Sequence, residues 1–237
     1  MEATYRDSAL FGENLLAPLD QVTADWASFD LQQVKVAKWT MGAIVGSQCS
    51  VPLRPPSGTA EEGDSEHSDG NQLGERSKKF MPGAHCLGDI LANAGYHNVF
   101  LGGADLSFAG KGKFLSQHGY QELWGDEQWK AAGLTARGPW GLHDDKLLEQ
   151  ASLRLDQLRA EGKPFNLTIL TLDTHSPRGH VSPSCEPFRH EGYAGIVKCT
   201  AGLLAKFVED FKRKGFAADT DLVIMGDHLS MKNPVSK

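Results

Sequence analysis

The sequence lacks the features that mark membrane spans, signal peptides and nucleic-acid-binding surfaces. No apolar run approaches the roughly 18–20 residues that a membrane-spanning helix requires. The first residues, MEATYRDSAL, contain no basic segment followed by an apolar one, so they do not form a signal peptide. The formal net charge is -6 and the pI is near 5.8, which argues against a general nucleic-acid-binding protein.

Cysteines are scarce, and no two of them form a CxxC pair, which disfavours a zinc knuckle. They stand at Cys49, Cys86, Cys185 and Cys199. An even number permits two disulfides in three possible connectivities. Four separate thiols, as in a cytosolic protein, are the alternative. Spacing alone leaves both alternatives open.

The length of 237 residues and the apolar content of 40% fit one large α/β domain with a sizeable core. The stretch 55–79 differs from the rest, because it is polar, charged and nearly free of apolar residues. Such a stretch cannot bury enough surface to offset the entropy lost on ordering. We therefore expect a single domain over 1–237 that carries a flexible polar insertion at 55–79.

Short apolar runs alternate with helical patterns along the rest of the chain. Three runs suit buried parallel strands: 97–102, 165–172 and 221–225. Apolar spacing predicts two long helices and one shorter helix that ends at a glycine: 144–159, 195–214 and 86–94. The alternation predicts an α/β fold with a mostly parallel central sheet and helices on both faces.

Chemically capable side chains follow each predicted strand. Asp227 and His228 come after the third, Asp173 and His175 after the second, and a glycine-rich segment with Lys111 after the first. Ligands of open α/β sheets bind beyond the carboxyl ends of the strands. These residues are therefore expected to gather in one region.

Each of these residues has a functional and a structural interpretation. Asp227 and His228 suit a divalent metal, although an adjacent Asp-His pair is more often a capping or surface pair. His175 could donate to a phosphate or protonate a leaving group, or could simply be a turn histidine before a proline. Lys111, flanked by glycines, could bind an anion that approaches the backbone, or could lie in a solvated turn.

Thr40 stands at the start of an apolar segment that suggests a buried helix. A threonine in that place is usually an N-cap. The functional alternative is a hydroxyl at the positive end of the helix, where the dipole and a metal would stabilise its alkoxide. Asp144 and Asp145 begin the predicted helix 144–159, and we interpret them as structural acids that favour the helix dipole.

Seven segments match one known family, in the same order as in that family, and together they span nearly the whole chain. They are MEATY, WTMGAIVGSQCSVPL, CLGDILANAGY, FLGGADLSFAGKGKFLSQHGY, WGLHDDKLLEQA, LTLDTHSPRGH and GDHLSMKN. Together they resemble the phosphoglycerol transferase I family of osmoregulated periplasmic glucan synthesis. More distantly they are similar to lipoteichoic acid synthases and to the sulfatase and alkaline phosphatase superfamily. The resemblance therefore implies an alkaline-phosphatase-like fold.

The resemblance implies a role for each matched residue. Thr40 matches the nucleophile that becomes a glycerophosphoryl-threonine and also contacts the metal. Asp227 and His228 match two further ligands of one divalent metal, Mn²⁺ or Mg²⁺. His175 and Lys111 match positions that contact the phosphoglycerol group, and His175 could also protonate the leaving oxygen.

The resemblance also implies partners and a location. The donor would be phosphatidylglycerol, the acceptor a periplasmic glucan, and the full-length protein would lie at the periplasmic face of the inner membrane. The cysteines match positions of two disulfides, Cys49–Cys86 and Cys185–Cys199, which suit an oxidising compartment.

The sequence departs from the family at both ends. Family members carry a Glu-Ser pair just before the segment matched by Met1 and Glu2, and that Glu is a metal ligand at the end of the first strand. Membrane helices would precede it, and the chain stops nine residues after His228. We expect a truncated catalytic domain without its first strand and C-terminal portion, with weakened metal binding and impaired transfer.

Several alternatives stand beside this hypothesis. A phosphoethanolamine transferase or phosphodiesterase of the same superfamily would use the same residues. A non-catalytic lipid- or glucan-binding remnant need not bind metal. A serine hydrolase is disfavoured because no GxSxG segment occurs. Sulfatase activity is disfavoured because sulfatases use a formylglycine made from Cys or Ser where this chain has Thr40.

Overall fold

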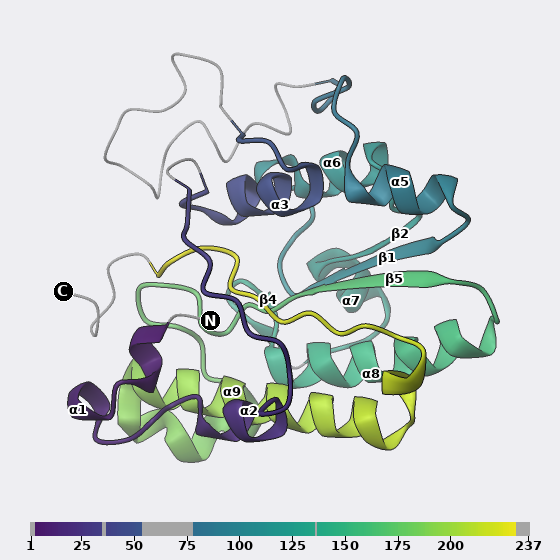
Figure 1. Cartoon of the computed structure of the whole chain (residues 1–237). Helices are drawn as coiled ribbons and strands as arrows, with labels where there is room; N and C mark the ends of the chain where they lie inside the picture. The colour runs from purple at the N-terminus through teal and green to yellow at the C-terminus, as the bar shows by residue number, and fades with distance from the viewer. Residues whose placement is uncertain (1–2, 35–36, 54–77, 136, 231–237) are drawn as a thin grey trace, which may run out of the picture.

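The computed structural model describes residues 3–34, 37–53, 78–135 and 137–230 of the chain. At its centre lies a three-stranded parallel sheet in the order β2-β1-β5 (Figure 1). The sheet strands are β1 (His97–Gly102), β2 (Glu122–Trp124) and β5 (Phe165–Leu170). A short antiparallel ribbon pairs β3 (Arg137–Gly138) with β4 (Gly141–Leu142). The predicted α/β class with a parallel central sheet is confirmed.

Helices surround this sheet, and those predicted at 86–94, 144–159 and 195–214 are all present as α5, α8 and α9. The α-helices are α1 (Ser8–Phe11), α2 (Ala17–Val22), α3 (Thr40–Cys49), α5 (Leu87–Asn93), α6 (Lys111–Gln117), α7 (Asp126–Ala131), α8 (Asp144–Ala160) and α9 (Gly192–Arg213). The 3-10 helices are η1 (Ala3–Arg6), η3 (Phe108–Gly110), η4 (Pro183–Glu191) and η5 (Phe216–Ala218).

The two faces of β1 point into two different hydrophobic cores. Phe100 packs in a cluster with Met41 of α3 and Phe114 of α6, above the sheet in Figure 1. Val99 and Leu101 belong to a second cluster, built with apolar side chains of α8 and α9 below the sheet. Successive side chains of a strand point to opposite faces, so this division is what a strand buried on both sides requires. Helices therefore cover both faces, as predicted.

A third cluster fixes the N-terminal segment against the far side of α9. Leu16 and Leu19 pack with Tyr193 and Val197, and Tyr5 completes the cluster. Helix α9 thus has apolar contacts on two sides, which explains why eleven of its 22 residues are buried. It connects the N-terminal segment to the sheet.

The strand predicted at 221–225 does not form. Leu222 and Ile224 pack against the cores, whereas Val223 and Met225 are 78% and 53% exposed. This alternation suits a strand, but no strand of the described residues exchanges ladder hydrogen bonds with the run. A strand needs a neighbour to pair with, and the available edge strand β5 pairs only with β1.

Both disulfides implied by the family resemblance form. Cys49–Cys86 joins the end of α3 to the residue before α5, and Cys185–Cys199 joins η4 to α9. All four cysteines are therefore paired.

The polar insertion predicted at 55–79 lies outside the described residues, except for Lys78 and Lys79. Among the residues that the structure describes, none of the helices has the length and apolar character needed to cross a bilayer.

Candidate active site

Two buried aspartates connect the end of β5 to the start of α8. Asp144 is fully buried, and its carboxylate accepts hydrogen bonds from the backbone N–H groups of Leu172 (2.6 Å) and Asp173 (3.0 Å). Asp173, only 1% exposed, accepts in return from the N–H of Asp144 at 3.0 Å. Backbone donors beyond Leu170 thus bond to a side chain and not to a strand, which is why β5 ends earlier than the predicted 165–172.

His143 extends this arrangement toward solvent. Its Nδ1 lies 2.7 Å from Asp173 Oδ1, and this hydrogen bond raises the pKa of the imidazole against the opposing effect of burial. Burial and the nearby charge of Asp173 raise the pKa of Asp144. The ring also touches the ribbon, since a Cβ at Gly138 would come within 2.9 Å of His143 Cε1. Only glycine permits that close approach.

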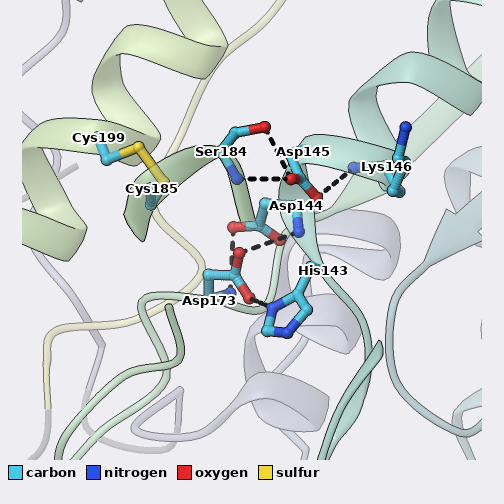
Figure 2. The surroundings of a disulfide bond; sticks show 8 residues. All are labelled: His143, Asp144, Asp145, Lys146, Asp173, Ser184, Cys185 and Cys199. Carbon is cyan, nitrogen blue, oxygen red and sulfur yellow. Dashed lines mark hydrogen bonds and ion pairs between the residues drawn. A yellow bond between two sulfur atoms is a disulfide. The ribbon is translucent and has the colours of Figure 1, made fainter. Parts of the chain in front are cut away.

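A second contact from the start of α8 reaches the Cys185–Cys199 disulfide. Figure 2 shows Asp145 beside Ser184, whose N–H and hydroxyl donate to Asp145 Oδ2 at 3.1 and 2.8 Å. Because Ser184 precedes Cys185, the disulfide and this carboxylate together hold η4 against α8. The loop between β5 and α9 is therefore anchored at both of its ends.

His175 lies in that loop, two residues after Asp173. Its Nδ1 is 2.7 Å from the carbonyl oxygen of Ser176, which can only accept, so Nδ1 carries a proton and Nε2 is left for a ligand. The ring stacks on Trp140 with centroids 4.8 Å apart. Trp140 sits between β3 and β4, where Gly141, at a φ of 138°, lets the turn approach the loop after β1.

Asp227 and His228 present two donor atoms side by side. His228 Nδ1 lies 2.8 Å from the carbonyl oxygen of Leu229, so this nitrogen is the protonated one and Nε2 carries the lone pair. That Nε2 is 3.4 Å from Asp227 Oδ2. A carboxylate oxygen and an imidazole nitrogen in this arrangement can bind one divalent cation.

Hydrogen bonds tie the Asp227–His228 segment to two other parts of the chain. Ser230 Oγ lies 3.1 Å from Ser176 Oγ, next to His175. The N–H of Leu229 donates to the side chain of Gln33, in the segment that leads to α3. Figure 1 shows residues 221–230 in yellow passing beside this N-terminal segment. A serine–serine hydrogen bond therefore connects the segments of His175 and Asp227, although the strand predicted before Asp227 does not form.

Thr40 is the first residue of α3 and is half-buried. The N-cap is Trp39, in extended conformation and without a side-chain cap, so the threonine is not the N-cap that the structural alternative proposed. Its hydroxyl makes no hydrogen bond with the described residues and lies at the positive end of the helix. The position favours a negatively charged ligand or an alkoxide.

Lys111 is buried to an unusual degree for a lysine. It is 3% exposed at the start of α6, with its Nζ 5.9 Å from the centre of the Phe100 ring. No carboxylate within the described residues forms an ion pair with it, and Asp105 acts on it only from a distance. Burial therefore lowers the pKa of Lys111 to about 8. The solvated turn of the structural interpretation is wrong for this lysine.

A second group of potential metal ligands has a structural role. Cys86, Asp89 and His118 have ligand atoms close enough together to hold an ion. However, Cys86 sulfur is bonded to Cys49, so no thiolate is available there. Asp89 instead lies 2.9 Å from His118 Nδ1, and the contact joins α5 to the end of α6. We assign this group no metal.

Comparison with known families shows which family the chain belongs to. The Sulfatase family model matches residues 44–235, which is most of the chain. The chain belongs to the sulfatase family. The match covers β1, β5, Lys111, His175, Asp227 and His228, and begins just after Thr40.

Relatives of this sulfatase-family chain include proteins named phosphoglycerol transferase I. That of Xanthomonas campestris pv. campestris is 36% identical over 245 residues, and that of Salmonella paratyphi B is 35% identical over 247 residues. Each match covers the whole of this chain but only 33% and 30% of the relative. The chain thus spans about a third of the length of the curated relatives that it matches.

Solved structures support the fold of the sulfatase-family chain. An alkaline phosphatase superfamily protein of Vibrio parahaemolyticus matches with a TM-score of 0.61 and 19% identity, covering 88% of this chain and 48% of the other. The lipoteichoic acid synthase LtaP of Listeria monocytogenes matches with a TM-score of 0.58 and 16% identity, covering 86% and 48%. At these identities the likeness concerns the fold alone.

The sequence patterns of this sulfatase-family chain do not single out two residues of the candidate site, and they predict a third only in part. Trp140 and His143 lie between predicted elements and have no periodic pattern that would single them out. Asp144 begins a helix, as the sequence predicts, but its carboxylate is fully buried and accepts a hydrogen bond from the backbone beyond the end of β5. One sequence signal could have indicated that Asp144 pairs with Asp173. Asp144 stands at the start of a predicted helix, and Asp173 directly follows a predicted strand.

We predict that Asp144→Asn destabilises the protein. The new amide would place an NH₂ group against one of two backbone N–H donors and leave that donor unpaired in a buried site. The free energy of unfolding in urea should fall by about 1–3 kcal/mol. Asp156→Asn is the control, because it removes a half-exposed ion pair with Lys214 and should cost less than about 1 kcal/mol. Equal losses would contradict the proposed importance of the buried pair.

We predict that Lys111→Met stabilises the protein at pH 7 by about 1–3 kcal/mol, because it removes a buried charge that has no ion-pair partner. Between pH 8 and 10.5 the native lysine loses its proton while the unfolded lysine keeps it, so wild-type stability rises and the advantage of the variant shrinks. Denaturation across this pH range measures both. Lys163→Met, at an exposed site, should change little; destabilisation by Lys111→Met at every pH would refute the account.

Proposed function

We propose that the chain carries the catalytic machinery of a phosphoglycerol transferase, with Thr40 as nucleophile. The observation that carries this proposal is the joining of the His175 and Asp227–His228 segments through Ser176 and Ser230. The names of the relatives, phosphoglycerol transferase I, support the choice of the transferred group. A Thr hydroxyl at a helix N-terminus suits phosphoryl transfer through a covalent intermediate if a carboxylate and an imidazole hold a metal beside it.

Two displacements would complete the reaction. In the first, Thr40 Oγ bonds to the phosphorus of phosphatidylglycerol, the bond from phosphorus to the diacylglycerol oxygen breaks, and that oxygen takes up a proton. In the second, an acceptor hydroxyl attacks the glycerophosphoryl-threonine and frees Thr40. The acceptor that we propose is a periplasmic glucan, as in the family that the sequence resembles. Dividing the transfer in this way replaces one difficult step by two easier ones.

His175 and Lys111 would act on the phosphate. The free Nε2 of His175, once protonated, can donate to a phosphate oxygen or to the departing diacylglycerol oxygen. The stacked ring of Trp140 fixes the orientation of the imidazole. Lys111 would supply a positive charge in a dry environment, where its attraction to an anion is strong.

The donor set at Asp227 and His228 fits a single divalent cation. Asp227 Oδ2 and His228 Nε2 lie 3.4 Å apart and both carry lone pairs. Bound there with the Thr40 hydroxyl as a further ligand, Mn²⁺ or Mg²⁺ would lower the pKa of that hydroxyl and polarise the phosphoryl oxygen. The mixed oxygen and nitrogen donors favour Mn²⁺ over Mg²⁺, which prefers oxygen alone.

The two disulfides support an oxidising location such as the periplasm. A phospholipid donor would require the site to face a membrane surface. The periplasmic side of the inner membrane satisfies both conditions.

The direct test is to look for the covalent intermediate. The protein is incubated with Mn²⁺ and a fluorescent phosphatidylglycerol, diacylglycerol release is followed, and mass spectrometry locates any adduct. We predict a glycerophosphoryl group on Thr40, no adduct with Thr40→Ala, and at least about tenfold less with Asp227→Asn. Asp219→Asn, which alters an exposed carboxylate beside Arg159, should behave as wild type.

Absence of an adduct from folded wild-type protein that binds Mn²⁺ would contradict the transferase proposal and favour a binding remnant. Reaction with phosphatidylethanolamine in place of phosphatidylglycerol would shift the proposal to a phosphoethanolamine transferase. Release of glycerophosphate to water without transfer to a glucan would indicate a phosphodiesterase.

A further inference from the structure

A cavity of about 530 Å³ lies between the loop after His175 and the start of α9. Its polar lining consists of His143, Arg178, His180, Arg189 and Tyr193. The volume falls within the range of small-ligand sites. No metal ligand or nucleophile of the proposed reaction lines it, so the proposed transfer does not account for its composition.

The charges around the cavity are predominantly positive. Arg178 is exposed and forms no ion pair with any described residue, so its guanidinium is available to a ligand. Arg189 is paired with Glu186, at 2.6 and 2.8 Å, and contributes less. Asp173 is the carboxylate behind the wall, and its oxygens already accept from His143 and from the backbone of the next helix. The carboxylates of Asp144 and Asp145 also act on His143, and both already accept hydrogen bonds. An anion entering the cavity would thus meet a free guanidinium, with the opposing carboxylates engaged behind the wall.

Two imidazoles add directional donors. His143 uses Nδ1 for Asp173, which leaves Nε2 for a ligand, and the same hydrogen bond raises the pKa of the ring. The backbone N–H of His180 donates to the carbonyl of Asp173 at 2.7 Å, which holds this residue in place. Burial lowers the pKa of His180, and a bound anion would oppose this shift by favouring the protonated ring.

The backbone conformation at Gly179 keeps the cavity-lining segment 178–180 close to α9. Gly179 has a φ of 65°, and a Cβ there would come within 2.9 Å of both the Asp173 carbonyl oxygen and Ile196 Cδ1. Any other residue would push Arg178 and His180 away from α9. The glycine therefore sets the positions of the two cationic candidates on either side of it.

One indole ring separates the cavity from His175. Trp140 stacks on His175 at 4.8 Å and lies 6.2 Å from the ring of His180 on the cavity side. Pro139, the neighbour of Trp140, lines the cavity itself. A ligand held here would be one aromatic ring away from the proposed phosphate-contacting histidine.

We infer that this cavity is a binding subsite for a phosphate-ester anion, with Arg178 as its principal cation and His180 and His143 as hydrogen-bond donors. A planar guanidinium can hold two phosphate oxygens at once, and its attraction to the anion needs no compensating group. The binding does not depend on the proposed transfer reaction. Within that proposed function, the subsite would hold a second phosphate, on a lipid headgroup or on a soluble ester, beside the reacting one.

The experiment measures binding without metal or donor turnover. Glycerol 1-phosphate is titrated into the protein in the presence of EDTA, and affinity is followed by calorimetry and by imidazole ¹H–¹⁵N shifts. We predict shifts at His180 and His143, and about tenfold weaker binding by Arg178→Gln, as expected from losing a charge-assisted contact worth about 1.4 kcal/mol. His180→Gln should also weaken binding. Arg213→Gln, on the exposed end of α9 with its partner Asp210, is the matched control.

A second experiment distinguishes a phosphate on a lipid headgroup from one on a soluble ester. Co-sedimentation with phosphatidylglycerol vesicles, against phosphatidylcholine vesicles, reports a lipid headgroup, whereas binding of glycerol 1-phosphate alone reports a soluble ester. Either result supports the subsite if Arg178→Gln weakens it more than Arg213→Gln. Equal effects of the two arginine variants, or no binding in either arm, would overturn it. The adduct is measured with metal and donor and the subsite without either, so loss of the covalent adduct and loss of this subsite are distinguishable.

Discussion

The candidate site depends on the reciprocal hydrogen bonding between Asp144 and Asp173. Each carboxylate accepts backbone N–H groups from the other's segment, so the end of β5 and the start of α8 are held in one geometry. Two acidic groups in a buried place are costly unless such donors satisfy them. The two buried aspartates lie at the carboxyl end of a parallel strand, which is where ligands of these folds bind. The same contact fixes His143 through Asp173 and sets where the loop of His175 begins.

Short polar contacts and one aromatic stack connect the loop of His175 to the neighbouring segments. Ser176 and Ser230 join the His175 loop to the segment of Asp227 and His228, and Trp140 orients the imidazole of His175. The disulfide Cys185–Cys199 limits movement of η4 at the other end of the loop. Residues that lie far apart in the sequence therefore share one region because of a few specific contacts, while the hydrophobic cores supply most of the stability.

The local elements could be predicted from the sequence, because their signals are local. Apolar periodicity located β1, α8 and α9 closely, and a run of small and apolar residues located α3. The predicted strand 221–225 failed because pairing depends on a neighbour, which no local pattern reports. Lys111 was recognised as a possible anion ligand from its glycine context, but its burial is a tertiary property. The cation-lined cavity beside Arg178 could not be predicted either, since α9 and the loop meet only in the folded chain.

The central proposal is that Thr40, Asp227 and His228 hold one metal ion. Diffraction at the manganese absorption edge, from crystals of the protein grown with Mn²⁺, tests this claim directly. The account predicts one anomalous peak at bonding distance from Asp227 and His228 and adjacent to the Thr40 hydroxyl. A peak ligated by other residues, or none at these three under saturating Mn²⁺, would contradict it.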